Sequence, residues 1–135
     1  MSLIGIDYGG KRIGIAVSES GVLASPHSVL PNDGRLLDRL AGLSAEVGAE
    51  TFVVGLARRS RSTAGERKFH EFAERLRQRT CKPVVLWDET LSTVDAAQRL
   101  RAAGRRRVQG REDLDMYAAA VILQSYLDAR PGRAS

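Results

Sequence analysis

The amino-acid sequence predicts an α/β domain in which helices pack on a mixed β-sheet. Branched apolar residues recur with a period of two at 3–6 and 13–17, and Gly9 and Gly10 permit a tight reversal between these runs. Beyond residue 34, short apolar runs alternate with stretches of helical periodicity. This order of strands and helices, without an internal repeat or a linker, indicates one layered domain.

Size and composition agree with this class. The chain has 135 residues, of which 43% are hydrophobic, and a chain of this size can bury a real core. We expect residues 1–135 to form one domain that ends in a flexible tail at 129–135. No apolar run approaches the roughly 20 residues that cross a bilayer, and we expect neither a signal peptide nor a membrane partner. The one cysteine, Cys81, cannot form an internal disulfide, so a cytoplasmic location is expected.

The first predicted strand ends in an acidic residue, Asp7. A carboxylate at the end of an apolar strand must face water or be held by a cation or by hydrogen-bond donors. The glycines that follow would let a sugar-phosphate chain approach the backbone. The alternative is that Asp7 simply opens the turn, as aspartate often does.

The next elements are a strand at 22–30 and a helix. Pro26 favours an edge or bulged position for the strand. Asp33 is the expected N-cap of the helix, and Gly48 is placed to end it. The apolar stripe of this helix consists of Leu36, Leu40, Leu43 and Val47.

A buried strand at 51–56 precedes the second helix, for which Thr63 and Glu66 form a capping box. The apolar stripe of this helix consists of Phe69, Phe72, Ala73 and Leu76.

The last strand, at 83–87, is followed directly by Asp88 and Glu89. Ser92 and Asp95 form another capping box, and Gly104 is placed to end the helix that they start. The terminal helix, from about residue 115 to 128, is apolar on most faces and should be buried on more than one side.

The charge of the chain points to a polyanionic partner, with nucleic acid first. The formal net charge is +5 and the pI is about 10.0. Two stretches, 57–65 and 99–111, contain three and six arginines without an acid. A solvated surface is the alternative for each stretch. The candidate phosphate contacts are Lys11, Arg12, Arg58, Arg59, Arg61, Arg105, Arg106 and Arg107.

Three acidic residues occupy positions that are unusual for acids on a protein surface. Asp7 and Glu89 follow strands, and Asp115 lies on a buried helix stripe with the small residue Ala119. Carboxylates converging without His or Cys are ligands for Mg²⁺ or Mn²⁺, and they suit phosphodiester hydrolysis. The alternatives are a surface role for Glu89 and a helix-dipole role for Asp115. Asp88 and Asp113 are possible supports of the site.

Four motifs in this order resemble the YqgF (RuvX-like) family over residues 3–128: G-I-D-Y-G-G-K-R-I-G-I-A-V, V-V-G-L, W-D-E-T-L-S-T and D-M-Y-A-A-A-V-I-L-Q-S-Y-L-D. The resemblance implies a ribonuclease H-like fold with a central mixed five-stranded sheet and helices on both faces. It implies a Mg²⁺- or Mn²⁺-dependent nuclease for 5′-end maturation of pre-16S ribosomal RNA, or alternatively a Holliday junction resolvase. By position, the acidic residues of the family correspond to Asp7, Glu89 and Asp115.

Two departures from the family pattern bear on the substrate. Ala57 and a short arginine-rich loop replace the proline and longer loop that the family usually has, and Thr90 replaces an arginine. We therefore expect a nucleic-acid partner, either precursor rRNA or branched DNA, and leave open whether the protein is a monomer or a homodimer.

Two other functions are compatible with parts of the sequence. Asp-x-Gly-Gly after a strand also resembles the phosphate loop of the actin, hexokinase and heat-shock ATPase superfamily, which needs two lobes to enclose a nucleotide. A nucleic-acid-binding module without activity is the other alternative, and the presence of all three acids argues against it.

Overall fold

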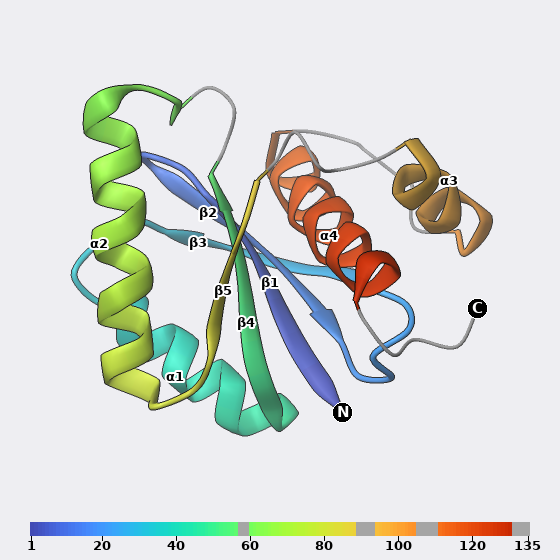
Figure 1. Cartoon of the computed structure of the whole chain (residues 1–135), viewed down its shortest axis with the longest axis horizontal. Coiled ribbons are helices and arrows are strands. Elements are labelled where there is room, and N and C mark those ends of the chain that lie inside the picture. The colour runs from blue at the N-terminus through green and yellow to red at the C-terminus, as the bar shows by residue number, and fades with distance from the viewer. Residues whose placement is uncertain (57–59, 89–93, 105–110, 131–135) are drawn as a thin grey trace.

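The computed structural model describes residues 1–56, 60–88, 94–104 and 111–130, with the side chains of 94, 99 and 111–113 outside that description (Figure 1). The strands in this part of the chain are β1 (Ser2–Tyr8), β2 (Arg12–Ser18), β3 (Ser25–Pro31), β4 (Ala49–Leu56) and β5 (Val84–Trp87). The helices are α1 (Leu36–Val47), α2 (Thr63–Thr80), α3 (Val94–Ala102) and α4 (Arg111–Ala129). Among these helices, none is long and apolar enough to span a membrane.

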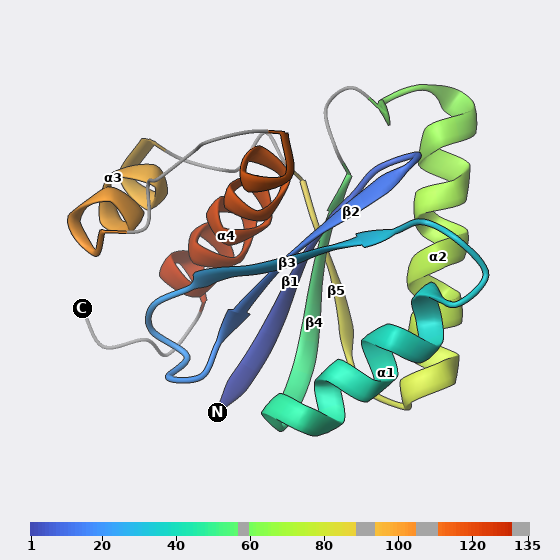
Figure 2. The ribbon, with the colours of Figure 1, turned by 180° about the vertical axis from the view of Figure 1, so that it is seen from behind.

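The five strands form one mixed sheet in the order β3-β2-β1-β4-β5 (Figures 1 and 2). β1 lies at its centre, antiparallel to β2 and parallel to β4. β4 and β5 are parallel because α2 returns the chain to the same end of the sheet between them. The predicted mixed five-stranded sheet is confirmed.

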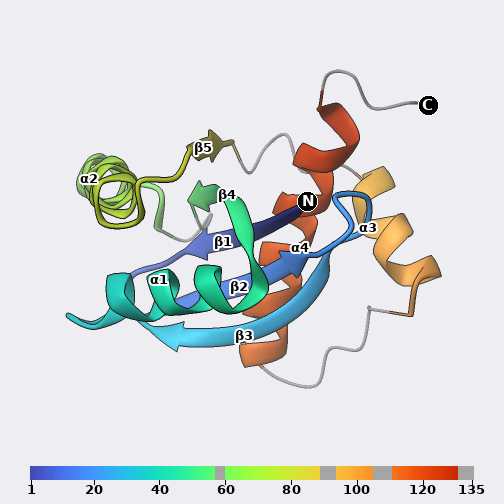
Figure 3. The same cartoon turned by 90° about the horizontal axis from the view of Figure 1, so that it is seen from below.

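Helices cover both faces of the sheet. Figures 1 and 3 show α1 and α2 on one side of the strands and α4 on the other, with α3 beyond α4. Alternation along β1 sends Ile4 and Ile6 into the core under α1 and α2, whereas Leu3 belongs to the core under α4. The prediction that the terminal helix is buried on more than one side is confirmed, since α4 contacts both the sheet and α3.

Glycines on the sheet allow α4 to approach it closely. A Cβ added to Gly14 would lie 2.0 Å from the carbonyl oxygen of Asp115, and one added to Gly5 would lie 3.0 Å from that of Ala119. Gly55 of β4 also faces the helix, and a Cβ added there would lie 2.7 Å from the Cδ1 of Ile122. Ala119 itself is fully buried. The backbone of α4 therefore rests on the strands at distances that larger residues would prevent.

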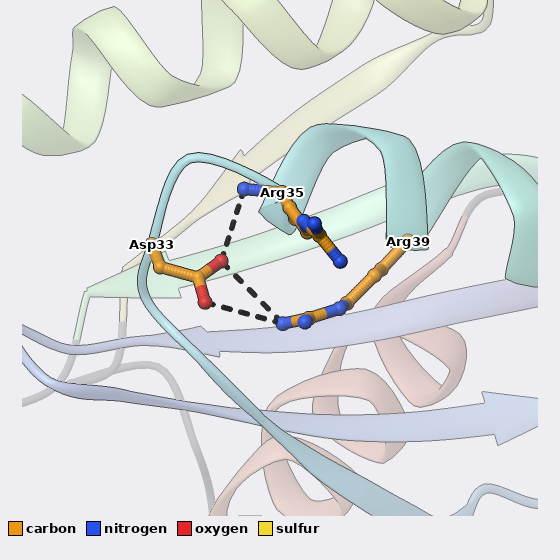
Figure 4. Close-up of polar contacts among 3 residues, drawn as sticks. All are labelled: Asp33, Arg35 and Arg39. Carbon is orange, nitrogen blue, oxygen red and sulfur yellow. Dashed lines mark hydrogen bonds and ion pairs between the residues drawn. The ribbon is translucent and has the colours of Figure 1, made fainter.

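The predicted start of α1 was wrong. Its N-cap is Arg35, without a side-chain cap, and the helix begins at Leu36. Asp33 instead holds the turn before the helix: its Oδ1 accepts a hydrogen bond from the backbone N–H of Arg35 at 3.0 Å, and its carboxylate pairs with Arg39 (Figure 4). Gly48 ends the helix in the left-handed conformation, as predicted. The apolar stripe of α1 is confirmed in the core.

The predicted capping box of α2 was wrong by one residue. Ser62, not Thr63, is the N-cap, and its Oγ accepts a hydrogen bond from the N–H of Gly65 at 2.9 Å. Both hydroxyls could cap, and the extended backbone at Ser62 decides between them. The predicted stripe of four apolar residues on this helix is confirmed as buried.

The remaining boundaries differ modestly from those predicted. The third strand starts at Ser25 instead of residue 22. α4 begins at Arg111, which puts Asp115 one turn inside the helix instead of at its start, and it reaches Ala129, the first residue of the expected tail. Gly104 has a positive φ, as expected of a residue that ends a helix. The predicted cap at Ser92 lies outside the described residues.

Candidate active site

Asp7 and Asp115 are brought together by Gly14. Asp7 is paired with Gly14 across β1 and β2, and both residues lie on the face of the sheet that α4 covers. The backbone of Asp115 passes directly over the same glycine. Each aspartate is only 3% exposed. Two aspartates that are 108 positions apart in the sequence therefore both lie next to one glycine, between the sheet and α4.

An ion pair fixes Asp115. The Nε–H of Arg12 donates to its Oδ2 at 2.7 Å. Arg12 is the first residue of β2, directly after the glycine turn, and its side chain is 29% exposed. Burying a carboxylate is costly unless a counter-charge and hydrogen bonds compensate for the lost water. The guanidinium of Arg12 provides this compensation at the edge of the site.

The donors of this site suit a divalent metal ion. Asp7 and Asp115 both offer carboxylate oxygens, and hard oxygen ligands are those that Mg²⁺ and Mn²⁺ prefer. The Oδ1 atom of Asp7 is buried and accepts no hydrogen bond within the described part of the chain, although the residue is not without polar contacts. Two buried carboxylates on one face therefore fit the metal that the sequence predicts.

Glu89, the third predicted ligand, lies outside the described residues, as does the side chain of Asp113. Accordingly, the described residues contain no group of three or more potential metal ligands. Asp88 is described: it is exposed and pairs with Arg61. The roles predicted for Glu89, Asp88 and Asp113 stay predictions.

The strand that leads to Glu89 is anchored to α4. Trp87 ends β5, its Nε1 donates to the Oγ of Ser125 at 3.3 Å, and its ring packs edge-on against Tyr126. Through Gly55, Trp87 lies in the same row across the sheet as Asp7. The chain thus leaves the sheet toward Glu89 from a point that is fixed against α4.

The side chains predicted to contact phosphate differ in their exposure and in their ion pairs. Lys11 is exposed in the turn between β1 and β2, Arg12 pairs with Asp115, and Arg61 pairs with Asp88. Asn32 holds this turn, since its Nδ2 donates to the carbonyl oxygen of Gly9 at 2.9 Å. Arg58, Arg59, Arg105, Arg106 and Arg107 lie outside the described residues. The phosphate-binding role of all these side chains stays a prediction.

Sequence reasoning missed three features of the site. They are the ion pair of Arg12 with Asp115, the close contact of Gly14 with α4, and the anchor at Trp87. Gly14 could have been noticed in the sequence, because it interrupts a run of branched residues in a predicted strand. A glycine at such a position often marks a close approach of another backbone. The ion pair left no such signal, because its partners are 103 positions apart.

Comparison with protein families gives a match over residues 1–129 to the model described as "RuvX: Holliday junction resolvase". A protein of Geobacillus kaustophilus named "Putative pre-16S rRNA nuclease" is 42% identical over 96% of this chain and 99% of its own length. A protein of Mycolicibacterium paratuberculosis with the same name is 44% identical over 94% of this chain and 80% of its own length.

Solved structures share the fold at low sequence identity. Thermus thermophilus RuvC in complex with a Holliday junction superposes with a TM-score of 0.70 at 20% identity, covering 98% of this chain and 97% of that one. The yeast mitochondrial Holliday junction resolvase gives a TM-score of 0.51 at 13% identity over 93% of this chain and 77% of its own. These likenesses confirm the ribonuclease H-like fold.

Proposed function

The chain belongs to the RuvX family, and from this premise we propose that it is a nuclease that hydrolyses phosphodiester bonds in structured nucleic acid with the help of Mg²⁺ or Mn²⁺. The observation that carries this proposal is the pair of buried aspartates, Asp7 and Asp115, that both lie next to Gly14. A basic chain with carboxylates held at this point of the fold combines a means of binding phosphates with ligands for a metal.

In this mechanism Asp7 and Asp115 would hold the metal, with Glu89 as the third ligand. When bound there, the ion would supply the Lewis-acid chemistry that activates water and stabilises negative charge on the phosphate. The sheet and α4 supply rigidity, because both aspartates lie on regular elements and not on loops. Lys11, Arg61 and the arginines outside the described residues bind flanking phosphates and set the position of the strand to be cut.

The first candidate substrate is the 5′ region of pre-16S ribosomal RNA, processed in the cytoplasm during ribosome biogenesis. Relatives with that name are 42% and 44% identical to this chain over nearly its whole length. A Holliday junction is the second candidate, because the description of the matching family names it. Symmetrical cleavage of a junction would require a two-fold dimer, whereas processing of an RNA end requires one site.

A panel of end-labelled substrates tests the proposal. Precursor 16S RNA, a linear RNA, a linear DNA duplex and a synthetic four-way junction are incubated with the protein and Mg²⁺ or Mn²⁺. We expect cleavage of the precursor near the mature 5′ end, and nearly complete loss of cleavage in Asp115→Asn. The matched control is Asp38→Asn, which removes an exposed carboxylate that pairs with Arg79.

The outcomes of this panel separate the candidates. Cleavage of the junction alone would favour the second substrate. Absence of cleavage of every substrate with both metals, or full activity of Asp115→Asn, would contradict the proposed function.

A further inference from the structure

The positively charged guanidinium of Arg12 lies next to a buried carboxylate, at the point where the proposed function requires a metal ion. Its Nε lies 2.7 Å from the Oδ2 of Asp115, a side chain that is 3% exposed. In four other ion pairs of the described residues, the carboxylates are 47% to 73% exposed. Exposed pairs contribute little, whereas a charge pair removed from water interacts strongly. The pair of Arg12 with Asp115 therefore belongs to a different class from the surface pairs.

A divalent cation and a guanidinium cannot both be close to the same carboxylate without repelling each other. Arg12 stands at the start of β2 with 29% of its side chain exposed, so it has a route toward solvent. The backbone of Asp115 is held by α4 against Gly14, and the residue is only 3% exposed. Arrival of a metal should therefore displace the arginine and not the aspartate.

We propose that Arg12 is a positioning residue that acts as the resident counter-ion of the metal site. Its guanidinium holds Asp115 in place in the metal-free protein and competes with the divalent cation for that carboxylate. This inference rests on the proposed metal-dependent function. It has two opposite consequences: Arg12 stabilises the metal-free fold, and it weakens the binding of the metal.

The two consequences distinguish this role from simpler ones. An ion pair that served only the fold would stabilise the protein without changing its affinity for metal. A side chain that only oriented Asp115 for the metal would strengthen metal binding, so its removal would weaken it. If Arg12 is a competing counter-ion, removing its side chain should destabilise the metal-free protein and strengthen metal binding.

The test measures metal binding without nucleic acid, on the full chain after chelation and dialysis. Mn²⁺ is titrated by calorimetry into the wild type, Arg12→Gln and Arg12→Lys, and each protein is melted in EDTA. We expect Arg12→Gln to melt at a lower temperature and to bind Mn²⁺ about tenfold more tightly, equivalent to about 1.4 kcal/mol. Arg12→Lys keeps the charge and should remain close to the wild type in affinity.

The matched control is Arg39→Gln, which removes the exposed pair with Asp33. It should change neither the melting temperature in EDTA nor the affinity for Mn²⁺ appreciably. A second measurement needs no variant: the Nε–H signal of Arg12 in ¹⁵N NMR should be protected from solvent exchange in the metal-free wild type and should lose that protection when Mg²⁺ is added.

The failures are distinguishable. Unchanged or weaker Mn²⁺ binding by Arg12→Gln, in a wild type that does bind Mn²⁺, overturns the inference alone. Protection of the Arg12 signal that persists at saturating Mg²⁺ also overturns it, even if Arg12→Gln does not fold. A wild type that binds neither ion overturns the inference together with the metal-dependent function.

Discussion

At the scale of single residues, Asp7 is the position where function and stability conflict most clearly. It is buried on a face of β1 whose other positions are apolar or glycine, and a buried carboxylate is unfavourable unless donors or a cation hold it. A second carboxylate about 5 Å away would add repulsion of roughly 3 kcal/mol at an effective dielectric constant of about 20. A residue that lowers stability in this way is expected where it is required for function and not for folding.

The first prediction follows from this conflict. Asp7→Asn keeps the shape of the side chain and removes its charge, so in EDTA the variant should unfold at a higher temperature than the wild type while losing nearly all cleavage. Each kcal/mol of relieved repulsion corresponds to roughly 3–5 °C in a domain of this size. Millimolar Mn²⁺ should stabilise the wild type more than the variant, because the proposed site binds the ion only when it keeps this carboxylate.

Paired melting curves with and without Mn²⁺ decide this prediction. Asp33→Asn provides the control, because Asp33 is an exposed carboxylate in the turn before α1. A destabilised Asp7→Asn that responds to Mn²⁺ as the wild type does would show that Asp7 serves the fold of β1 and is not a metal ligand.

At the scale of elements, the position of α4 depends on the glycines beneath it. A methyl group at Gly14 would meet the carbonyl oxygen of Asp115 at 2.0 Å, so β2 and α4 would have to separate. We predict that Gly14→Ala destabilises the protein by about 2–3 kcal/mol, at the upper end of the overpacking range. Cleavage should fall in the fraction that remains folded, because Asp115 moves relative to Asp7.

Gly42→Ala is the matched control for Gly14. Gly42 lies within α1, is exposed, and a Cβ there would meet nothing within 4 Å. This change should stabilise the protein by roughly 0.5–1 kcal/mol, because alanine is the better helix former. Denaturant unfolding of the two variants provides the comparison, and equal stability of Gly14→Ala and the wild type would contradict the close packing of α4.

A third prediction concerns the arginine-rich segment between α3 and α4. If Arg105, Arg106 and Arg107 contact phosphates, replacing all three with alanine should reduce the slope of log affinity against log salt. The reduction should reach about 2–3, because each phosphate contact contributes roughly 0.7–0.9. Filter binding across a salt series measures it, and an unchanged slope would mean that these arginines are only solvated.

Local patterns predicted the elements well and their contacts poorly. Period-two runs identified β1 and β2, and Asp7 and Asp115 stood out because they interrupted apolar patterns. Ser62 and Thr63 can both cap a helix, and the backbone angles decide which of them caps α2. The sequence does not specify these angles, since either residue can adopt them. The ion pair of Arg12 with Asp115 is a tertiary contact, and no pattern within either segment specifies it.

At the scale of the whole molecule, the two faces of the sheet differ in composition. The face under α1 and α2 carries branched and aromatic residues and forms a conventional core. The face under α4 carries the glycines at 5, 14 and 55 and both described aspartates of the site. Substitutions in the first core should therefore change stability mainly, whereas those under α4 should change activity and stability together.

The measurement that tests the central claim most directly is a metal titration of cleavage. Protein that has been exhaustively chelated and dialysed is given labelled precursor 16S RNA and increasing Mn²⁺ or Mg²⁺. We predict no cleavage without metal, and a return of cleavage that saturates over the concentration range in which Mn²⁺ binds in calorimetry. Asp7→Asn and Asp115→Asn should remain inactive at every concentration. Cleavage that survives chelation, or that returns fully in either variant, would contradict a metal site built on these two carboxylates.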